Sequence, residues 1–121
     1  MPTVYTVLTP IIPTLSTSAA PVLTFTSAAA NQVVPLSSTL MTMVFIKNTS
    51  TTQTVTFTHH KTGDSDEVVS APNGTTLAGV WLPYRWANTD STSGAYNGCE
   101  ITWGATANMS IAVVQVPYAS K

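Results

Sequence analysis

The chain is divided into short runs of β-branched and aromatic residues, and turn residues separate these runs at fairly regular intervals. A helix would instead place apolar residues at the i, i+3, i+4 spacing over three or more turns. The only candidate for a helix, residues 27–32 (SAAANQ), is too short. This pattern restricts the chain to an all-β fold in which short strands pair side by side.

About eight strands are expected in this chain of 121 residues. This number fits a two-sheet antiparallel β-sandwich, jelly-roll-like, in which each sheet buries one face against the other. The runs that predict strands are residues 3–8, 22–28, 31–36, 40–48, 54–60, 68–72, 75–88, 99–103 and 109–116. We divide the chain into an N-terminal strand and Pro-rich arm (residues 1–21) and a single β-sandwich domain (residues 22–121). The strand order does not follow from the pattern.

Two of these runs predict how their side chains are arranged. Residues 40–48 (LMTMVFIKN) form the most hydrophobic run, which is typical of a strand covered on both faces. Residues 54–60 (TVTFTHH) alternate, so Val55, Phe57 and His59 are expected on one face and the three threonines with His60 on the other.

Charged residues are unusually scarce in this sequence. Asp, Glu, Lys and Arg make up 7% of the residues, whereas an average soluble domain has about 25%. The chain has 22 threonines and 12 serines, so its polar surface is mostly hydroxyl. Because the cores of protein interfaces are depleted in charge, we expect this chain to work while packed against other subunits.

The same composition excludes several classes of protein. A net charge of −1 with scattered lysines argues against a nucleic-acid-binding protein, which needs a basic stripe for phosphates. The longest apolar runs are far shorter than a membrane span. Pro10 and Pro13 interrupt the first apolar stretch, so a signal peptide is not expected. The single cysteine, Cys99, cannot form an internal disulfide bond.

Residues 54–69 contain both histidines of the chain and three of its five carboxylates. Consecutive strand residues such as His59 and His60 point to opposite faces and cannot share one metal ion. The carboxylates Asp64, Asp66 and Glu67 supply only a fragment of a calcium-loop pattern. We therefore predict a polar hairpin tip without metal. The alternative is that copies of one histidine meet at a trimer axis and titrate near pH 6–7.

A catalytic site is not expected. The sequence has no Gly-x-Ser-x-Gly elbow, and Cys99 follows Asn97 and Gly98 in a predicted turn. Asp90 and Glu100 are the only carboxylates outside residues 64–67, so a carboxylate pair in a cleft is not indicated. We expect neither enzymatic activity nor a cofactor.

Residues 80–86 (VWLPYRW) hold the largest concentration of aromatic side chains. Trp, Tyr and Arg dominate the energetics of protein interfaces. We expect Trp81 and Trp103 in the core, and Tyr84, Arg85 and Trp86 at a rim or interface, with Pro83 interrupting the strand.

The Pro-rich arm, residues 10–21, is the second candidate for contact with another subunit. Proline holds a segment extended at low entropic cost, which suits a strap laid over a neighbour. The arm residues that we assign to the interface are Pro10, Ile11, Ile12 and Pro13. The alternative is a frayed terminus.

Residues 39–116 resemble the small head proteins of tailed bacteriophages that act as capsid cement or decoration proteins. The resemblance consists of an ordered series of short motifs: a strand ending at Asn48, the TVT of residues 54–56, the APNG turn of residues 71–74, the LPY of residues 82–84, the YNG of residues 96–98 and the SIAVV of residues 110–114. The loop before residues 96–98 is longer and richer in Ser and Gly than that family leads us to expect, so contacts made there need not carry over.

This resemblance implies a β-sandwich, forming a homotrimer, on the outside of a phage capsid. It implies that the protein binds the major capsid protein, bridges adjacent capsomers in the virion and is assembled in the host cytoplasm. No nucleic acid or membrane partner is expected. Two other functions remain open: a carbohydrate-binding host-adhesion module that uses Trp81, Tyr84 and Trp86 as a stacking platform, and a tail-tube or head–tail connector subunit.

Overall fold

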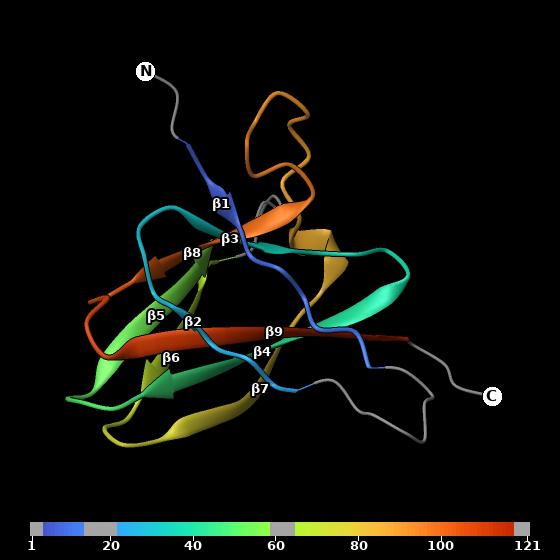
Figure 1. Cartoon of the computed structure of the whole chain (residues 1–121). Coiled ribbons are helices and arrows are strands. Elements are labelled where there is room, and N and C mark those ends of the chain that lie inside the picture. The colour runs from blue at the N-terminus through green and yellow to red at the C-terminus, as the bar shows by residue number, and fades with distance from the viewer. Residues whose placement is uncertain (1–3, 14–21, 59–64, 118–121) are drawn as a thin grey trace.

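The computed structural model describes residues 4–13, 22–58 and 65–117. Within these ranges the chain forms nine strands and one short 3-10 helix (Figure 1). The elements are β1 (Thr6–Val7), β2 (Thr26–Ser27), β3 (Gln32–Pro35), β4 (Leu40–Asn48), β5 (Gln53–Thr58), β6 (Glu67–Ala71), β7 (Thr76–Leu82), η1 (Tyr84–Trp86), β8 (Gly98–Trp103) and β9 (Met109–Pro117).

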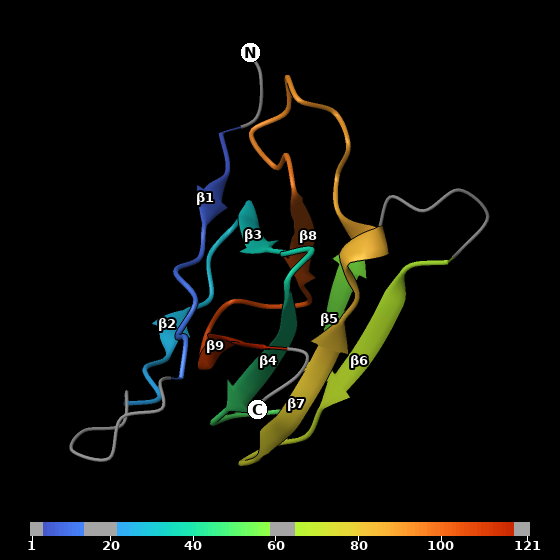
Figure 2. The ribbon, with the colours of Figure 1, turned by 90° about the vertical axis from the view of Figure 1, so that its right-hand side faces the viewer.

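The strands form two sheets, and the expectation of an all-β sandwich is confirmed (Figure 2). One sheet has five strands in the order β1-β3-β8-β5-β6, and the other has four in the order β2-β9-β4-β7. The pairing of β1 with β3 is parallel, and the other strand pairs are antiparallel.

The strand pairs follow a simple rule. β2 pairs with β9, β3 with β8, β4 with β7, and β5 with β6, so the chain pairs as one long hairpin whose turn lies between β5 and β6. Successive pairs belong alternately to the four-stranded and the five-stranded sheet. The hairpin is therefore wound from one layer to the other. The apolar pattern of the sequence does not predict which strands pair, because an apolar side chain can be buried equally well against the apolar side chains of many different strands.

The core lies between the two sheets and consists of aliphatic side chains around Phe57. Every second residue of β4 is buried. Val55 and Phe57 of β5 are buried on one face, and their shared face is the one that the alternation of residues 54–60 predicts. Burial of each large side chain contributes about 1.5–3 kcal/mol. The largest fully buried apolar side chains are Val33, Val34, Val44, Ile46, Val55, Phe57, Leu82, Cys99 and Ile111.

Buried amides join the ends of strands across the sandwich. The Asn48 side chain, 1% exposed, donates from Nδ2 to the carbonyl oxygens of Thr51 and Ala71, both at 2.8 Å. The Gln115 Nε2 donates to the carbonyl oxygen of Pro35 at 3.0 Å. A buried polar group without such partners would destabilise the fold, so these bonds tie strands of one sheet to strands of the other.

Several local predictions were wrong. Trp81 is 48% exposed rather than buried, because Leu82 takes the inward position at the end of β7. The outward side chains of β4 are only half-buried, so this strand is covered on one face and not on both. The runs 3–8 and 22–28 contribute two paired residues each, in β1 and β2. By contrast, Trp103, which we expected in the core, is half-buried and does pack against the core.

Candidate interaction surface

The outer face of the four-stranded sheet carries the side chains that β4, β7 and β9 do not bury. Met43 is the central position, since it pairs with Trp81 of β7 on one side and with Val114 of β9 on the other. Paired residues in a sheet point to the same face. We call this surface the apolar face; its members are Met41, Met43, Phe45, Trp81, Val114 and Val116.

The apolar face is open and nearly free of charge. Trp81 is 48% exposed, and the other members are half-buried. Among the described strand residues that point outward on this sheet, Lys47 is the one charged residue. Its ammonium lies 5.8 Å from the ring centroid of Phe25, within cation–π range.

The outer face of the five-stranded sheet has a different composition. Thr54 pairs with Ser70, and Thr56 lies between Val68 and Thr102. We call this surface the hydroxyl face; its hydroxyl-bearing members are Thr54, Thr56, Thr58, Ser70 and Thr102. The expected placement of Thr54, Thr56 and Thr58 opposite to the core is confirmed, and the two outer faces differ in chemistry.

Residues 10–13 of the N-terminal arm lie beside β9 of the four-stranded sheet, and residues 14–21 of the arm are outside the described residues. The Ile11 backbone N–H donates to the Val113 carbonyl oxygen at 2.7 Å, and its carbonyl oxygen accepts from the Gln115 N–H at 3.0 Å. This bridge places Ile11 next to Val114, at the border of the apolar face. Ile12 is 47% exposed and Pro13 is exposed. The predicted arm residues therefore enlarge the apolar face at its β9 side.

The aromatic segment after β7 turns away from the sheet at Pro83 and forms η1. Tyr84 is 39% exposed, and its hydroxyl donates to Asn97 Oδ1 at 3.4 Å. Arg85 is exposed, whereas Trp86 packs against the core. Because Trp81 lies on the apolar face and Trp86 lies against the core, these two rings and Tyr84 do not form one stacking platform.

The loop between η1 and β8 is held by its own hydrogen bonds. The buried Asn88 accepts from the Asp90 N–H at 2.8 Å and donates to Ser93 Oγ at 3.2 Å. The hydroxyl and backbone N–H of Thr92 both donate to Asp90, which lowers the pKa of that carboxyl. The Ser- and Gly-rich composition therefore forms a defined turn structure that stands above β3 and β8 (Figure 1).

The structure offers little support for metal or nucleophilic chemistry. The described ranges contain no group of three His, Cys, Asp or Glu side chains that would hold a metal ion. The predicted polar tip falls largely on residues 59–64, outside the described residues, while Asp66 and Glu67 are exposed. Cys99 is buried, and its Sγ donates to the Thr58 carbonyl oxygen at 3.0 Å. Burial, with the charges of Glu100 and Asp66, raises the pKa of this thiol to about 12, so it is a poor nucleophile at neutral pH.

Sequence reasoning found the rim of the apolar face but missed its centre. It selected residues 10–13 and 84–86, but it predicted that residues 40–48 are covered on both faces and gave no role to the outward side chains of β9. The signal was present in the sequence: residues 40–48 are apolar on both faces, and the fold covers only one of them. An apolar outward face that the chain itself leaves open is typical of an interaction surface.

Comparison with known proteins gave no match. No family model matches the chain, and neither a curated protein nor a solved structure matches it. In the described part of the chain, no helix is long and apolar enough to span a membrane. The function must therefore be argued from the surfaces.

Proposed function

We propose that this chain is a structural virion protein that binds the outside of an assembled phage head through the apolar face and stabilises the shell. The observation that carries the proposal is the contrast between the two outer faces. Met43, Trp81 and Val114 form the centre of one face, and Lys47 is its one charged residue among the described positions. The threonine-rich opposite face suits contact with water.

The composition of the apolar face suits a contact between proteins. A stable interface buries about 800 Å² on each partner and has a core of apolar and aromatic residues. Trp81 and the two methionines supply such a core, and methionine side chains adapt to an irregular partner surface. Tyr84 and Arg85, beyond one edge, and Ile12 and Pro13, beyond the other, would form the rim.

The partner surface follows from the same composition. Because Lys47, next to the apolar face, is the one charged residue among the described outward strand residues of this sheet, we expect the complementary surface of the capsid lattice to be apolar with an acidic group opposite Lys47. Ion pairs contribute little to such a contact, so binding is expected to change little with salt concentration.

Selective binding to the assembled lattice explains how such a protein would stabilise a shell. A ligand that binds one state and not another shifts the equilibrium by its difference in affinity. If each copy spans neighbouring capsid subunits, free subunits offer only part of the surface and bind weakly. Many copies, each adding a few kcal/mol, would then resist expansion of the shell by internal DNA.

The strand order gives further support. The orders β2-β9-β4-β7 and β3-β8-β5-β6, with β1 added at one edge, support the inference of a jelly-roll-like arrangement. Jelly rolls are frequent in viral capsid proteins and also in lectins. This support is an analogy of fold, because one fold serves many functions. The homotrimer implied by the sequence resemblance belongs to the same proposal.

One pair of variants tests the proposal. Met43→Lys places a charge at the centre of the apolar face, and Thr56→Lys places the same charge on the hydroxyl face. Heads assembled without this protein are mixed with each variant, and the bound fraction is measured by co-sedimentation. We expect Thr56→Lys to bind like the unchanged protein and Met43→Lys to lose binding at least tenfold, since an unpaired lysine would be desolvated in the contact.

The melting temperature of each variant shows whether it is folded, and unassembled capsid protein serves as a second control. Equal binding of Met43→Lys and the unchanged protein would contradict the proposal. Binding of the unchanged protein to free subunits as strongly as to heads would contradict the stabilising mechanism.

A further inference from the structure

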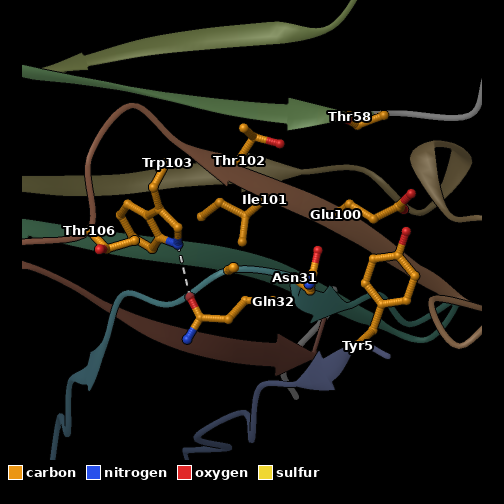
Figure 3. A pocket seen from close by; sticks show the side chains of 10 residues that line it. Tyr5, Asn31, Gln32, Thr58, Glu100, Ile101, Thr102, Trp103 and Thr106 are labelled. Carbon is orange, nitrogen blue, oxygen red and sulfur yellow. Dashed lines mark hydrogen bonds between the residues drawn. The ribbon is translucent and has the colours of Figure 1, made fainter. Parts of the chain in front are cut away.

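The five-stranded sheet carries an open pocket of about 380 Å³, and none of its lining residues belongs to the apolar face (Figure 3). This volume lies within the range of about 300–1,000 Å³ typical of small-molecule sites. The pocket crosses from the segment before β1, over the start of β3, to β8. Its lining residues are Tyr5, Ala30, Asn31, Gln32, Thr58, Glu100, Ile101, Thr102, Trp103 and Thr106.

Two aromatic rings lie at opposite ends of the pocket. Figure 3 shows Trp103 and Thr106 at one end and Tyr5 beside Glu100 at the other. Glu100 and Trp103 are three residues apart on β8, which corresponds to about 10 Å along a strand. The floor between them includes Ile101 and the start of β3.

The ring of Trp103 is fixed by a hydrogen-bond chain that reaches the other sheet. Its Nε1 donates to Gln32 Oε1 at 2.9 Å, and the same oxygen accepts from the Ala29 N–H at 3.1 Å. The Gln32 Nε2 donates to the Ser27 carbonyl oxygen at 3.0 Å. Gln32 is 2% exposed, so this support is buried. A ring held in this way loses little conformational entropy when a ligand stacks on it.

The remaining lining groups are polar but contain a single charge. Glu100 supplies a carboxylate, Asn31 an amide, and Thr58, Thr102 and Thr106 supply hydroxyl groups. Glu100 pairs with Thr58 across β8 and β5, so both point outward on the hydroxyl face. Hydrogen bonds to a charged carboxylate are stronger than those between neutral groups.

We propose that this pocket binds a neutral saccharide, with the size of a mono- or disaccharide. Sugar rings combine apolar C–H faces, which stack on aromatic rings, with hydroxyl groups that need several donors and acceptors at once. The Trp103 and Tyr5 rings meet the first need, and Glu100, Asn31 and the threonines meet the second. The carboxylate disfavours anionic sugars, because like charges repel.

The position of the pocket is compatible with the proposed virion role but does not depend on it. The pocket is lined by residues of the five-stranded sheet and its connections, whereas the apolar face belongs to the four-stranded sheet, so a partner on the apolar face would use none of the lining residues. A protein docked on a shell would then present the pocket to the surroundings. Loss of binding to heads by the Met43→Lys variant would leave saccharide binding unchanged.

The three tryptophans allow a direct test by NMR. The protein labelled with ¹⁵N is titrated with maltose, cellobiose, lactose and diacetylchitobiose at millimolar concentrations, and the three indole N–H signals are followed. We expect at least one sugar to shift the Trp103 signal in a saturable way, and the Trp81 and Trp86 signals to stay in place. Sialyllactose, as an anionic probe, and tetramethylammonium, as a cationic probe, should leave the Trp103 signal unshifted.

Variants then assign the binding to the pocket. Glu100→Gln and Tyr5→Ala should each weaken the affinity about tenfold or more, as expected for loss of a charged hydrogen bond or an aromatic contact. Trp81→Ala is the matched control and should bind normally. The proposal is overturned if none of the four sugars shifts the Trp103 signal, if only tetramethylammonium does, or if Glu100→Gln and Tyr5→Ala bind as the unchanged protein does.

Discussion

At the scale of the residue, Asn48 shows how one polar side chain organises a sheet that is otherwise apolar. Its two Nδ2 hydrogen bonds reach the turn after β4 and the end of β6, and its Oδ1 accepts from the Ser50 N–H at 2.9 Å. The side chain therefore links the two sheets at one end of the sandwich.

We expect Asn48→Ala to lower the free energy of unfolding by about 2–3 kcal/mol, because it leaves buried backbone groups without partners. Urea unfolding followed by tryptophan fluorescence measures the change. The matched control is Asn73→Ala, at an exposed turn position, which should change the free energy by less than about 0.5 kcal/mol. Equal effects of the two variants would show that Asn48 is not a structural link.

Cys99 gives a prediction that depends on pH. Burial first, then the charges of Glu100 and Asp66, raise the pKa of the folded thiol from 9.0 to about 12. We expect thiol reagents at pH 8 to leave the folded protein unmodified and to modify it in denaturant, because the reactive thiolate forms only when the chain opens. Rapid modification of the folded protein would contradict the buried position.

The raised pKa of Cys99 also makes the free energy of unfolding depend on pH. Below pH 9 the thiol is protonated in both the folded and the unfolded state, so its ionisation does not reduce the free energy of unfolding. As the pH rises from 9 towards 12, the unfolded thiol ionises first, so the free energy of unfolding falls. Over this pH range the decrease should be smaller in Cys99→Ala than in the unchanged protein, and an identical decrease would argue against the shift.

At the scale of the element, β7 and η1 place two tryptophans in different environments. Trp81 lies outward on β7, and Trp86 in η1 packs against the core because Pro83 changes the chain direction.

We expect Trp81→Ala to change the free energy of unfolding by less than about 1 kcal/mol, and Trp86→Ala to lower it by about 2 kcal/mol or more. Thermal or urea unfolding of the two variants distinguishes them. A larger loss for Trp81→Ala would show that the ring contributes to the core after all.

At the scale of the whole molecule, the two sheets give the protein two unlike outer surfaces on one core. The hydroxyl face supports contact with water, whereas the apolar face is expected to need a partner. The homotrimer remains a prediction from the sequence resemblance and the scarcity of charge.

Size-exclusion chromatography with light scattering should give the mass of a trimer at micromolar concentration. The trimer should persist at high salt, because salt screens interactions between charges and these contribute little to the affinity of a contact between charge-poor surfaces. A monomer at all concentrations would contradict the oligomer, and dissociation by salt alone would contradict the apolar nature of the contact.

The sequence by itself determined the class of fold and much of the local pattern. Period-two alternation placed Val55 and Phe57 inward and Thr54 and Thr56 outward, because side chains of a strand must point to opposite faces. The apolar run at residues 40–48 matched the bounds of β4. These features could be predicted from the sequence because the direction of each side chain in a strand depends only on its position relative to its neighbours along the chain.

Only the tertiary structure decided which apolar residues are covered. Met43 and Val44 are adjacent in an apolar run, yet Val44 faces the core and Met43 the outer surface, because a two-layer sandwich covers one face of each sheet. The winding of the long hairpin and the pocket between Tyr5 and Trp103 likewise depend on contacts between residues far apart in the sequence. Such contacts leave no periodic signal, so the apolar face and the pocket had to come from the structure.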